Sequence, residues 1–202
     1  LAQGGPDTLR AAELRRGDLT AAETGWPVSD LVITSYALAE IASTRQAQVV
    51  QALWDACSGV LVLVEPGTPA GAERILAARA LLLAGGATIV APCPHGGDCP
   101  MTSPRWCHFA QRLARSRDHR LAKGAEVPFE DEKFAYLVAA RPHLTAAPAQ
   151  ARVMGPPRVG KPGLDYEVCA AGGLERRFAA KRDKAAYAGL RHLRWGEGLP
   201  LD

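Results

Sequence analysis

Three of the five cysteines lie within fifteen residues, at Cys93, Cys99 and Cys107. Clustered cysteines in a reducing compartment favour metal binding over disulfides, because thiolates are strong ligands for soft metal ions. The loop that joins them is rich in proline and glycine and has little apolar surface to bury. A metal centre would supply the ordering energy that packing cannot provide there. A closed centre needs a fourth ligand, for which Cys169 is the candidate.

The spacing of the cysteines narrows the identity of the metal. Oxygen donors are scarce, with Asp98 alone inside the loop, which disfavours calcium and magnesium. Structural zinc sites usually contain cysteine pairs separated by about two to four residues, whereas these cysteines are separated by five and seven. Iron–sulfur clusters accept wider spacings, so the pattern favours such a cluster, with zinc as the alternative. His95 and His108 could each replace a thiolate, but histidines beside such ligands more often hydrogen-bond to sulfur.

A basic segment follows the cysteine-rich loop directly. Between residues 105 and 123 the cations are opposed by a single acid, Asp118, and Phe109 and Leu113 are spaced to share one face of a short helix. Trp106 and Phe109 could stack on bases. A one-sided cluster of arginines favours contact with phosphates, and a second basic patch lies near the C-terminus. The expected RNA-binding residues are Arg105, Arg112, Arg115, Arg117, Arg120, Lys123, Arg176, Arg177, Lys181 and Arg182.

The charge is distributed unevenly along the chain. The 202 residues carry a net charge of +3, but residues 1–90 hold 6 Lys and Arg against 9 Asp and Glu, whereas residues 91–202 hold 18 against 12. This asymmetry indicates that an anionic partner meets the second half. The apolar runs are too short to span a bilayer and residues 1–10 do not resemble a signal peptide. We therefore expect a cytoplasmic monomer without membrane contact.

The first half of the chain alternates between strand and helix patterns. Strands are predicted over 30–36, 60–65 and 87–91, and helices over 43–58 and 72–84. Ser43 and Gln46 match a capping box at the start of the first helix, Gly59 would end it, and Cys57 would lie on its buried stripe. Alternation of this kind predicts parallel strands with right-handed crossovers. Ligands of such sheets bind beyond the carboxyl ends of the strands, where Tyr36 and Glu65 lie.

The second half is predicted to return to this sheet and then to form a small β appendage. A strand is expected over 133–141, followed by short strands over 152–154, 164–169 and 174–179 and a final helix over 183–193. Cys169 would lie at a strand end facing the other cysteines. The metal centre would then join two distant segments, which indicates a structural role rather than electron transfer.

Four stretches of the sequence carry a resemblance to a known family. They are residues 16–19, written Arg-Gly-Asp-Leu, together with residues 29–41, 59–71 and 91–109. They resemble the small-ribosomal-subunit methyltransferase-like assembly family, which includes mitochondrial methyltransferase-like protein seventeen and its bacterial relatives. The resemblance implies an α/β fold with a partial Rossmann-like class I methyltransferase sheet in 1–92, a cysteine-rich cluster-binding insertion and basic helix in 93–125, and a returning strand, β-rich appendage and helix in 126–202.

The resemblance also implies cofactors. It points to a 4Fe–4S cluster on the four cysteines Cys93, Cys99, Cys107 and Cys169. For S-adenosylmethionine (SAM) it places Asp18 at the adenine and Thr34, Ser35 and Tyr36 at the methionine side.

Two parts of the methyltransferase pattern are missing from the sequence. The glycine-rich turn and the ribose-binding acid do not precede Arg16, and Gly4-Gly5 is a poor match for the turn. Without the glycine-rich turn we expect weak or no SAM binding by this chain, and a full-length protein with the turn could bind SAM. The Asn/Asp-Pro-Pro-Tyr signature of amino-group methylation is replaced by Thr34-Ser-Tyr-Ala37. Enzymatic activity therefore stays open at this point.

Three functions are compatible with these features. The first is an rRNA-binding assembly factor for the small ribosomal subunit, with a methyltransferase-like fold and a structural 4Fe–4S cluster. The second is an active SAM-dependent rRNA methyltransferase, and the third is a metal-stapled module that binds a protein. Steeply salt-dependent binding of small-subunit rRNA would favour the first two over the third.

Overall fold

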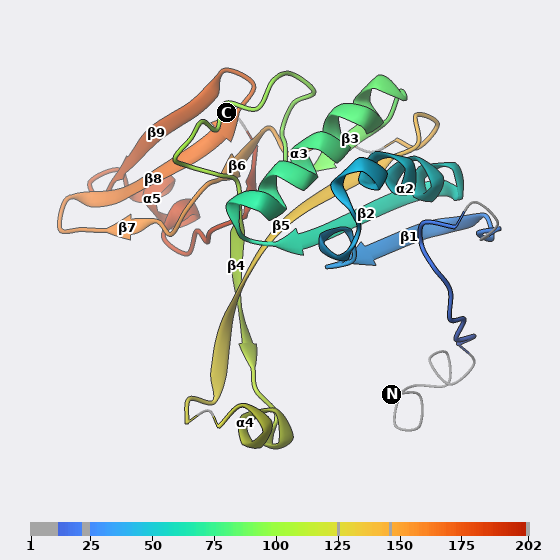
Figure 1. The fold of residues 1–202 in the computed structure, drawn as a ribbon. Coiled ribbons are helices and arrows are strands. Elements are labelled where there is room, and N and C mark those ends of the chain that lie inside the picture. Colours follow the sequence, from blue (N-terminus) through green and yellow to red (C-terminus); the bar gives the residue numbers. More distant parts are fainter. Residues whose placement is uncertain (1–11, 22–24, 125, 146, 201–202) are drawn as a thin grey trace.

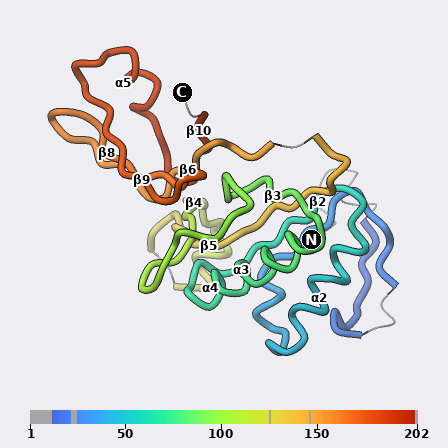
Figure 2. The backbone as a smooth tube through the Cα atoms, turned by 90° about the horizontal axis from the view of Figure 1, so that it is seen from above, coloured from blue at the N-terminus to red at the C-terminus, as the bar shows by residue number. Residues whose placement is uncertain are grey.

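The computed structural model describes residues 12–21, 25–124, 126–145 and 147–200. Two sheets lie next to each other, and a long two-stranded arm leaves the first of them (Figures 1 and 2). Gly4, Gly5 and the rest of residues 1–10 lie outside the described residues. In the described part of the chain, no helix is long and apolar enough to cross a membrane.

The first sheet mixes parallel and antiparallel pairing. Its strand order is β1-β2-β5-β3. The remaining strand, β4, pairs with the first half of β5, whereas β3 pairs with its last residues. The strands are β1 (Ser29–Ser35), β2 (Cys57–Pro66), β3 (Thr88–Ala91), β4 (Phe109–Ala114) and β5 (Phe129–Ala140). The three strands predicted in the first half and the returning strand are confirmed. Parallel pairing holds for β1 and β2, but β5 lies antiparallel between β2 and β3. Its apolar end, which includes Leu137 and Ala139, is fully buried there.

Two helices cover one face of this sheet. They are α2 (Ser43–Asp55) and α3 (Pro69–Ala84), which lie side by side (Figure 2). Alternate residues of β2, such as Leu61 and Leu63, are fully buried and join Val49 and Leu82 of the helices in one core. Burial of this apolar face contributes most of the free energy that stabilises the sheet. A short 3-10 helix, η2 (Leu38–Glu40), connects β1 to α2.

Both ends of α2 differ from the sequence prediction, whereas α3 ends at Ala84 as predicted. No capping box forms at α2, whose N-cap is Ala42, and the Gln46 side chain instead donates to the carbonyls of Leu38 and Ile41. The helix ends at Asp55, so Cys57 opens β2, although its predicted core role is confirmed by its 1% exposure. Gly59 lies inside β2 rather than at a helix end. A Cβ there would lie 2.3 Å from the Asp30 carbonyl oxygen, so only glycine permits this approach of β1.

The arm replaces the helix that was predicted over residues 105–123. Phe109 begins β4 instead of lying on a helix, and β4 and β5 run together away from both sheets with α4 (Arg117–Lys123) near the tip (Figure 1). Cross-strand pairs stabilise the strand, because Arg112 lies opposite Asp131 and Phe109 opposite Phe134. These partners come after the segment in the chain, so they are not visible in the segment itself.

The second sheet is the predicted β appendage. Its order is β10-β6-β8-β7, and β9 pairs with the other edge of β8. Helix α5 packs against β8 and β9 and is shorter than predicted. The elements are β6 (Ala151–Val153), β7 (Arg158–Val159), β8 (Gly163–Ala170), β9 (Gly173–Ala180), α5 (Lys184–Leu190) and β10 (Gly198–Leu199). The three predicted strands of this region are confirmed. The division into three parts at residues 92 and 125 stays a prediction.

Glu65 at the carboxyl end of β2 serves the fold. Its side chain is 1% exposed, accepts a hydrogen bond from the Leu38 backbone N–H at 3.1 Å and pairs with Arg74 of α3 at 2.6 Å. We expect Arg74→Met to lower the free energy of unfolding by about 3–5 kcal/mol, since it leaves a buried carboxylate without its cation. Urea denaturation measures this loss. The control is Arg15→Met, which breaks an exposed pair with Glu13 and should cost less than about 1 kcal/mol; equal effects would contradict the prediction.

Candidate metal centre and cationic surface

The four predicted cysteine ligands line one cavity at the junction of the two sheets. Cys93 follows β3 and Cys107 precedes β4, so both are held by the first sheet, with Cys99 on the loop between them. Cys169 lies in β8 of the second sheet. The structure thus brings together two segments that are 62 residues apart at their nearest cysteines. All five cysteines are free thiols, and their role as ligands stays a prediction.

The cavity is small and its other walls are largely apolar. They include Pro92, Pro94, Pro100 and Met101, and the enclosed volume is about 20 Å³. In the described residues, no group of three or more His, Cys, Asp or Glu side chains is arranged to hold a metal ion. The four thiols therefore share a cavity without converging on one point. Four sulfur donors with no carboxylate among the lining residues are a donor set for a soft metal.

The two histidines of the loop take different positions. His95 lines the cavity, and its Nε2 lies 3.8 Å from the Cys169 sulfur. This contact is of the kind predicted for a histidine that hydrogen-bonds to a thiolate. His108 faces away from the cavity lining and stacks on Trp106 with ring centroids 5.3 Å apart.

Burial favours the protonated form of three thiols of the cavity, those of Cys93, Cys107 and Cys169. Desolvation raises the pKa of Cys93 and Cys107 above the ordinary value, and it raises the pKa of Cys169 to about 11. The neighbouring sulfurs add to the rise, because several thiolates in one cavity would repel each other. Positive charge inside the cavity would reverse this balance. A metal ion bound there would displace the protons of its thiol ligands.

Two arginines hold the cysteine-rich loop from opposite sides. Arg79 of α3 is 6% exposed and donates to the carbonyls of His95 and Gly97 at 2.9 and 2.6 Å. Arg152 of β6 donates to the carbonyls of Pro92 and Gly196, both at 3.0 Å. Both guanidinium groups act to lower the pKa of Cys93. The sequence analysis missed them, although an arginine inside the apolar stretch 75–84 was a signal for Arg79.

The predicted SAM-site residues lie on two segments, with Asp18 in a turn before the first sheet and the other three at the end of β1. Asp18 accepts hydrogen bonds from the Thr20 N–H and hydroxyl at 2.7 and 2.8 Å, which lower its pKa. Thr34 and Ser35 end β1, and Tyr36 follows in the left-handed region with φ 57°. The Tyr36 hydroxyl donates to Glu132 of β5 at 2.7 Å, and burial with this hydrogen bond raises its pKa to about 12. Their assignment to SAM stays a prediction.

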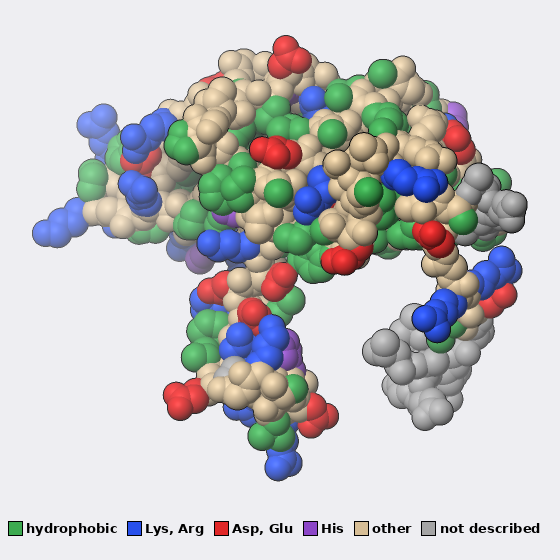
Figure 3. Space-filling view, viewed as in Figure 1, with side chains coloured by type: hydrophobic (Ala, Val, Ile, Leu, Met, Phe, Trp, Pro, Cys, Tyr) green, Lys and Arg blue, Asp and Glu red, His purple; other side chains and the backbone are tan. Residues whose placement is uncertain are grey.

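Most of the predicted RNA-binding cations are neutralised by acids. Six of the ten form ion pairs, so the one-sided arginine surface expected over 105–123 is not present on the arm. Figure 3 shows basic and acidic side chains interleaved along the arm. The pairs are Arg105 with Glu167, Arg112 with Asp131, Arg115 and Lys123 with Glu130, Arg176 with Asp165, and Arg177 with Glu175.

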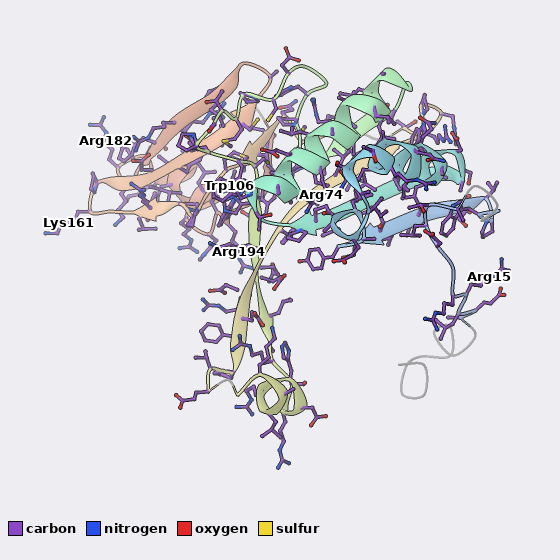
Figure 4. The ribbon with its side chains drawn as sticks, viewed as in Figure 1. Arg15, Arg74, Trp106, Lys161, Arg182 and Arg194 are labelled. Atoms are coloured by element: carbon purple, nitrogen blue, oxygen red, sulfur yellow. The ribbon has the colours of Figure 1, made fainter. Side chains whose placement is uncertain are left out.

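Three cations without an acidic partner cluster at the far end of the second sheet. Lys161 follows β7, whereas Lys181 and Arg182 follow β9, and Figure 4 shows Lys161 and Arg182 projecting from that end. Within the described ranges, these three side chains form no ion pair with an acid, although Lys181 lies 5.9 Å from the Tyr187 ring. Lys161 was missed in the sequence because it stands alone there. Of the other predicted cations, Arg117 and Arg120 lie on α4.

The chain matches known proteins over nearly its whole length. A family model described as "Mitochondrial small ribosomal subunit Rsm22" matches residues 3–200. "Ribosome assembly protein METTL17, mitochondrial" of Homo sapiens is 29% identical over 191 residues, which cover 85% of this chain and 40% of that protein. The Rsm22-cox11 tandem proteins 1 and 2 of Schizosaccharomyces pombe are each 28% identical over 221 aligned residues, covering 85% of this chain and 29% of theirs. The chain therefore spans less than half the length of these relatives.

These matches test two expectations from the sequence. The cytoplasmic location is contradicted, because the family and all three relatives are described as mitochondrial. The charge and the absence of an evident leader in residues 1–10 carried no information on this point. The family resemblance is confirmed, because the family model matches residues 3–200 of the chain. The chain belongs to the mitochondrial small ribosomal subunit Rsm22 family.

Proposed function

We propose that this chain is the RNA-binding part of an assembly factor for the small ribosomal subunit, stabilised by a thiolate-bound centre. The relative in Homo sapiens is named a ribosome assembly protein, which supports the role in assembly. The observation that carries the structural half of the proposal is the single cavity lined by cysteines from both sheets. A centre in this cavity would fix the second sheet against the first and hold its cations in one orientation.

A 4Fe–4S cluster fits the cysteines better than zinc, which stays the alternative. One zinc ion needs all four sulfurs at about 2.3 Å, and the described side chains do not converge in that way. A cluster binds each thiolate to a different iron, so its ligands stay farther apart. The present volume of about 20 Å³ would hold about one water, so the loop must move outward to accept a cluster. When bound, the cluster would supply a covalent connection between the sheets.

The RNA-binding surface in this proposal is the cationic end of the second sheet. Phosphates are attracted by cations that no acid neutralises, and this describes Lys161, Lys181 and Arg182 better than the arginines of the arm. Small-subunit rRNA is the anionic partner that the family match supports.

The test compares two charge-removing triple variants. We expect Lys161→Gln, Lys181→Gln and Arg182→Gln together to weaken binding of small-subunit rRNA, and to lower the slope of log affinity against log salt by about 2 to 3. The matched control is Arg112→Gln, Arg115→Gln and Lys123→Gln, which removes the same charge from paired positions on the arm. Filter binding over a salt series measures both. Equal losses in the two variants would contradict this placement of the surface, and no RNA binding by the wild-type protein would contradict the function.

A second candidate function is methyl transfer from SAM to rRNA. One observation favours it, because Tyr36 adopts φ 57° directly after a parallel strand, and backbone strain of this kind concentrates at functional sites. The proposal for this chain stays RNA binding. Transfer of a labelled methyl group to rRNA by a full-length relative of the chain would establish the second function.

A further inference from the structure

Two hollows meet at Arg105 on the surface between the sheets. The first has a volume of about 270 Å³ and is walled by Trp106, His108 and Trp195. The second has a volume of about 350 Å³ and is lined by Arg105, Arg158 and Arg176 with two acids. Both share Arg105 and the turn at residues 154–156, so they form one continuous groove. Figure 4 shows Trp106 at this junction, with Arg194 on the side of the arm.

The aromatic walls of the first hollow are held in place. The Trp106 indole N–H donates to the Gly67 carbonyl at 2.9 Å, while 36% of the residue stays exposed. Its ring stacks on His108 with an interplanar angle of 26°, and Trp195 meets His108 edge-on at 5.0 Å. Rings fixed in this way lose little conformational entropy when a flat ligand stacks on them.

Trp195 lines the same hollow and carries an indole donor that has no partner among the described residues. The donor atom, Nε1, is buried. Tryptophan can only donate there, and a buried donor without an acceptor costs free energy. A ligand with a carbonyl or ring-nitrogen acceptor at its edge would relieve this cost, and nucleobases carry such acceptors.

We propose that the aromatic hollow binds one unpaired base of an RNA strand, with the adjoining phosphates in the arginine-lined hollow. The proposal rests on the RNA-binding function proposed above and adds its mode of recognition. A base in a duplex has both faces covered, whereas a base in a single strand can be turned out and stacked on aromatic rings. In the second hollow Arg105 and Arg176 are paired with Glu167 and Asp165, so Arg158 supplies the excess positive charge that favours an anionic backbone. An apolar peptide would fit the first hollow but has no use for this excess of positive charge.

The test uses a fluorescein-labelled single-stranded RNA of about ten nucleotides, within the usual range of site sizes. We expect Trp106→Ala to weaken its binding roughly ten-fold or more, the effect of losing one stacked base. Trp106→Phe keeps an aromatic face and should retain most of the affinity. Trp26→Phe is the control, since that tryptophan lies beside α2 in a different pocket. Fluorescence anisotropy measures all four proteins, and a duplex of the same length should bind more weakly than the strand.

The outcomes separate this proposal from the function on which it rests. If the wild-type protein binds neither RNA, the proposed function itself fails. If it binds the strand but Trp106→Ala binds equally well, or if the duplex binds as tightly, the base-binding hollow is wrong and RNA binding stands. If Trp106→Ala also lowers the thermal stability or the metal content, its loss of affinity has a structural explanation. The affinity of Trp195→Phe for the single strand is then the deciding measurement. That variant removes the buried N–H, and unchanged affinity for the strand would overturn the proposal.

Discussion

Cys169→Ser is expected to lose its bound metal and much of its thermal stability together. The variant removes the one cysteine that the second sheet contributes to the shared cavity, so the two sheets lose their connection through the centre. Metal binding energy is folding energy in a site of this kind, and losing one of four ligands should destabilise the protein by several kcal/mol. Iron, zinc and sulfide analysis of anaerobically purified protein measures the first effect. Thermal unfolding followed by circular dichroism measures the second.

Cys57→Ser is the matched control for this prediction. Cys57 is also buried, but it packs in the core of the first sheet under α2. We expect that variant to lose about 1–3 kcal/mol through the buried hydroxyl while keeping the full metal content. A Cys169→Ser protein that retains its metal would remove Cys169 from the centre. Colourless wild-type protein with one zinc per chain would show that the centre is zinc and not a 4Fe–4S cluster.

Arg79→Met is expected to reduce metal content without removing any ligand. The change leaves the carbonyls of His95 and Gly97 without their buried donor and takes a positive charge away from Cys93. Two part-buried hydrogen bonds from a charged donor contribute about 3–6 kcal/mol together, and the Cys93 thiolate loses a neighbouring cation that favours its ionised form. Arg79→Lys should recover part of the metal content, because lysine restores the charge but not the forked geometry.

Arg141→Met distinguishes this role from a general loss of stability. Arg141 donates to the carbonyls of Trp54 and Cys57 at 2.6 and 2.7 Å, so it is also an arginine that binds two backbone oxygens, but it lies outside the lining of the cysteine cavity. We expect both variants to unfold at lower urea concentration and only Arg79→Met to lose metal. Equal metal content in the two proteins would show that Arg79 only supports the fold.

The strand patterns of the sequence were good predictors because they are local. Runs such as 60–65 are apolar and β-branched, and they need no distant information to be recognised as buried strands. The same local reasoning failed for β4. Phe109 and Leu113 have the spacing of a helix face, yet the acids of β5 lie opposite this segment and pair with its arginines. The spacing of apolar residues within one segment carries no information on ion pairs with residues 15 or 19 positions away.

The amino-acid sequence by itself determined the alternating strands and helices, the clustered cysteines and the basic character of the second half, since each depends on residue type and short spacing. Only the tertiary structure decided that β5 enters between β2 and β3, that Cys169 shares a cavity with the other three cysteines, and that Arg112 and Arg115 of the arm are paired with acids. These outcomes depend on strand register and on which surfaces meet. Such contacts join residues that are far apart in the chain, and their free energies are settled only when the whole molecule is packed.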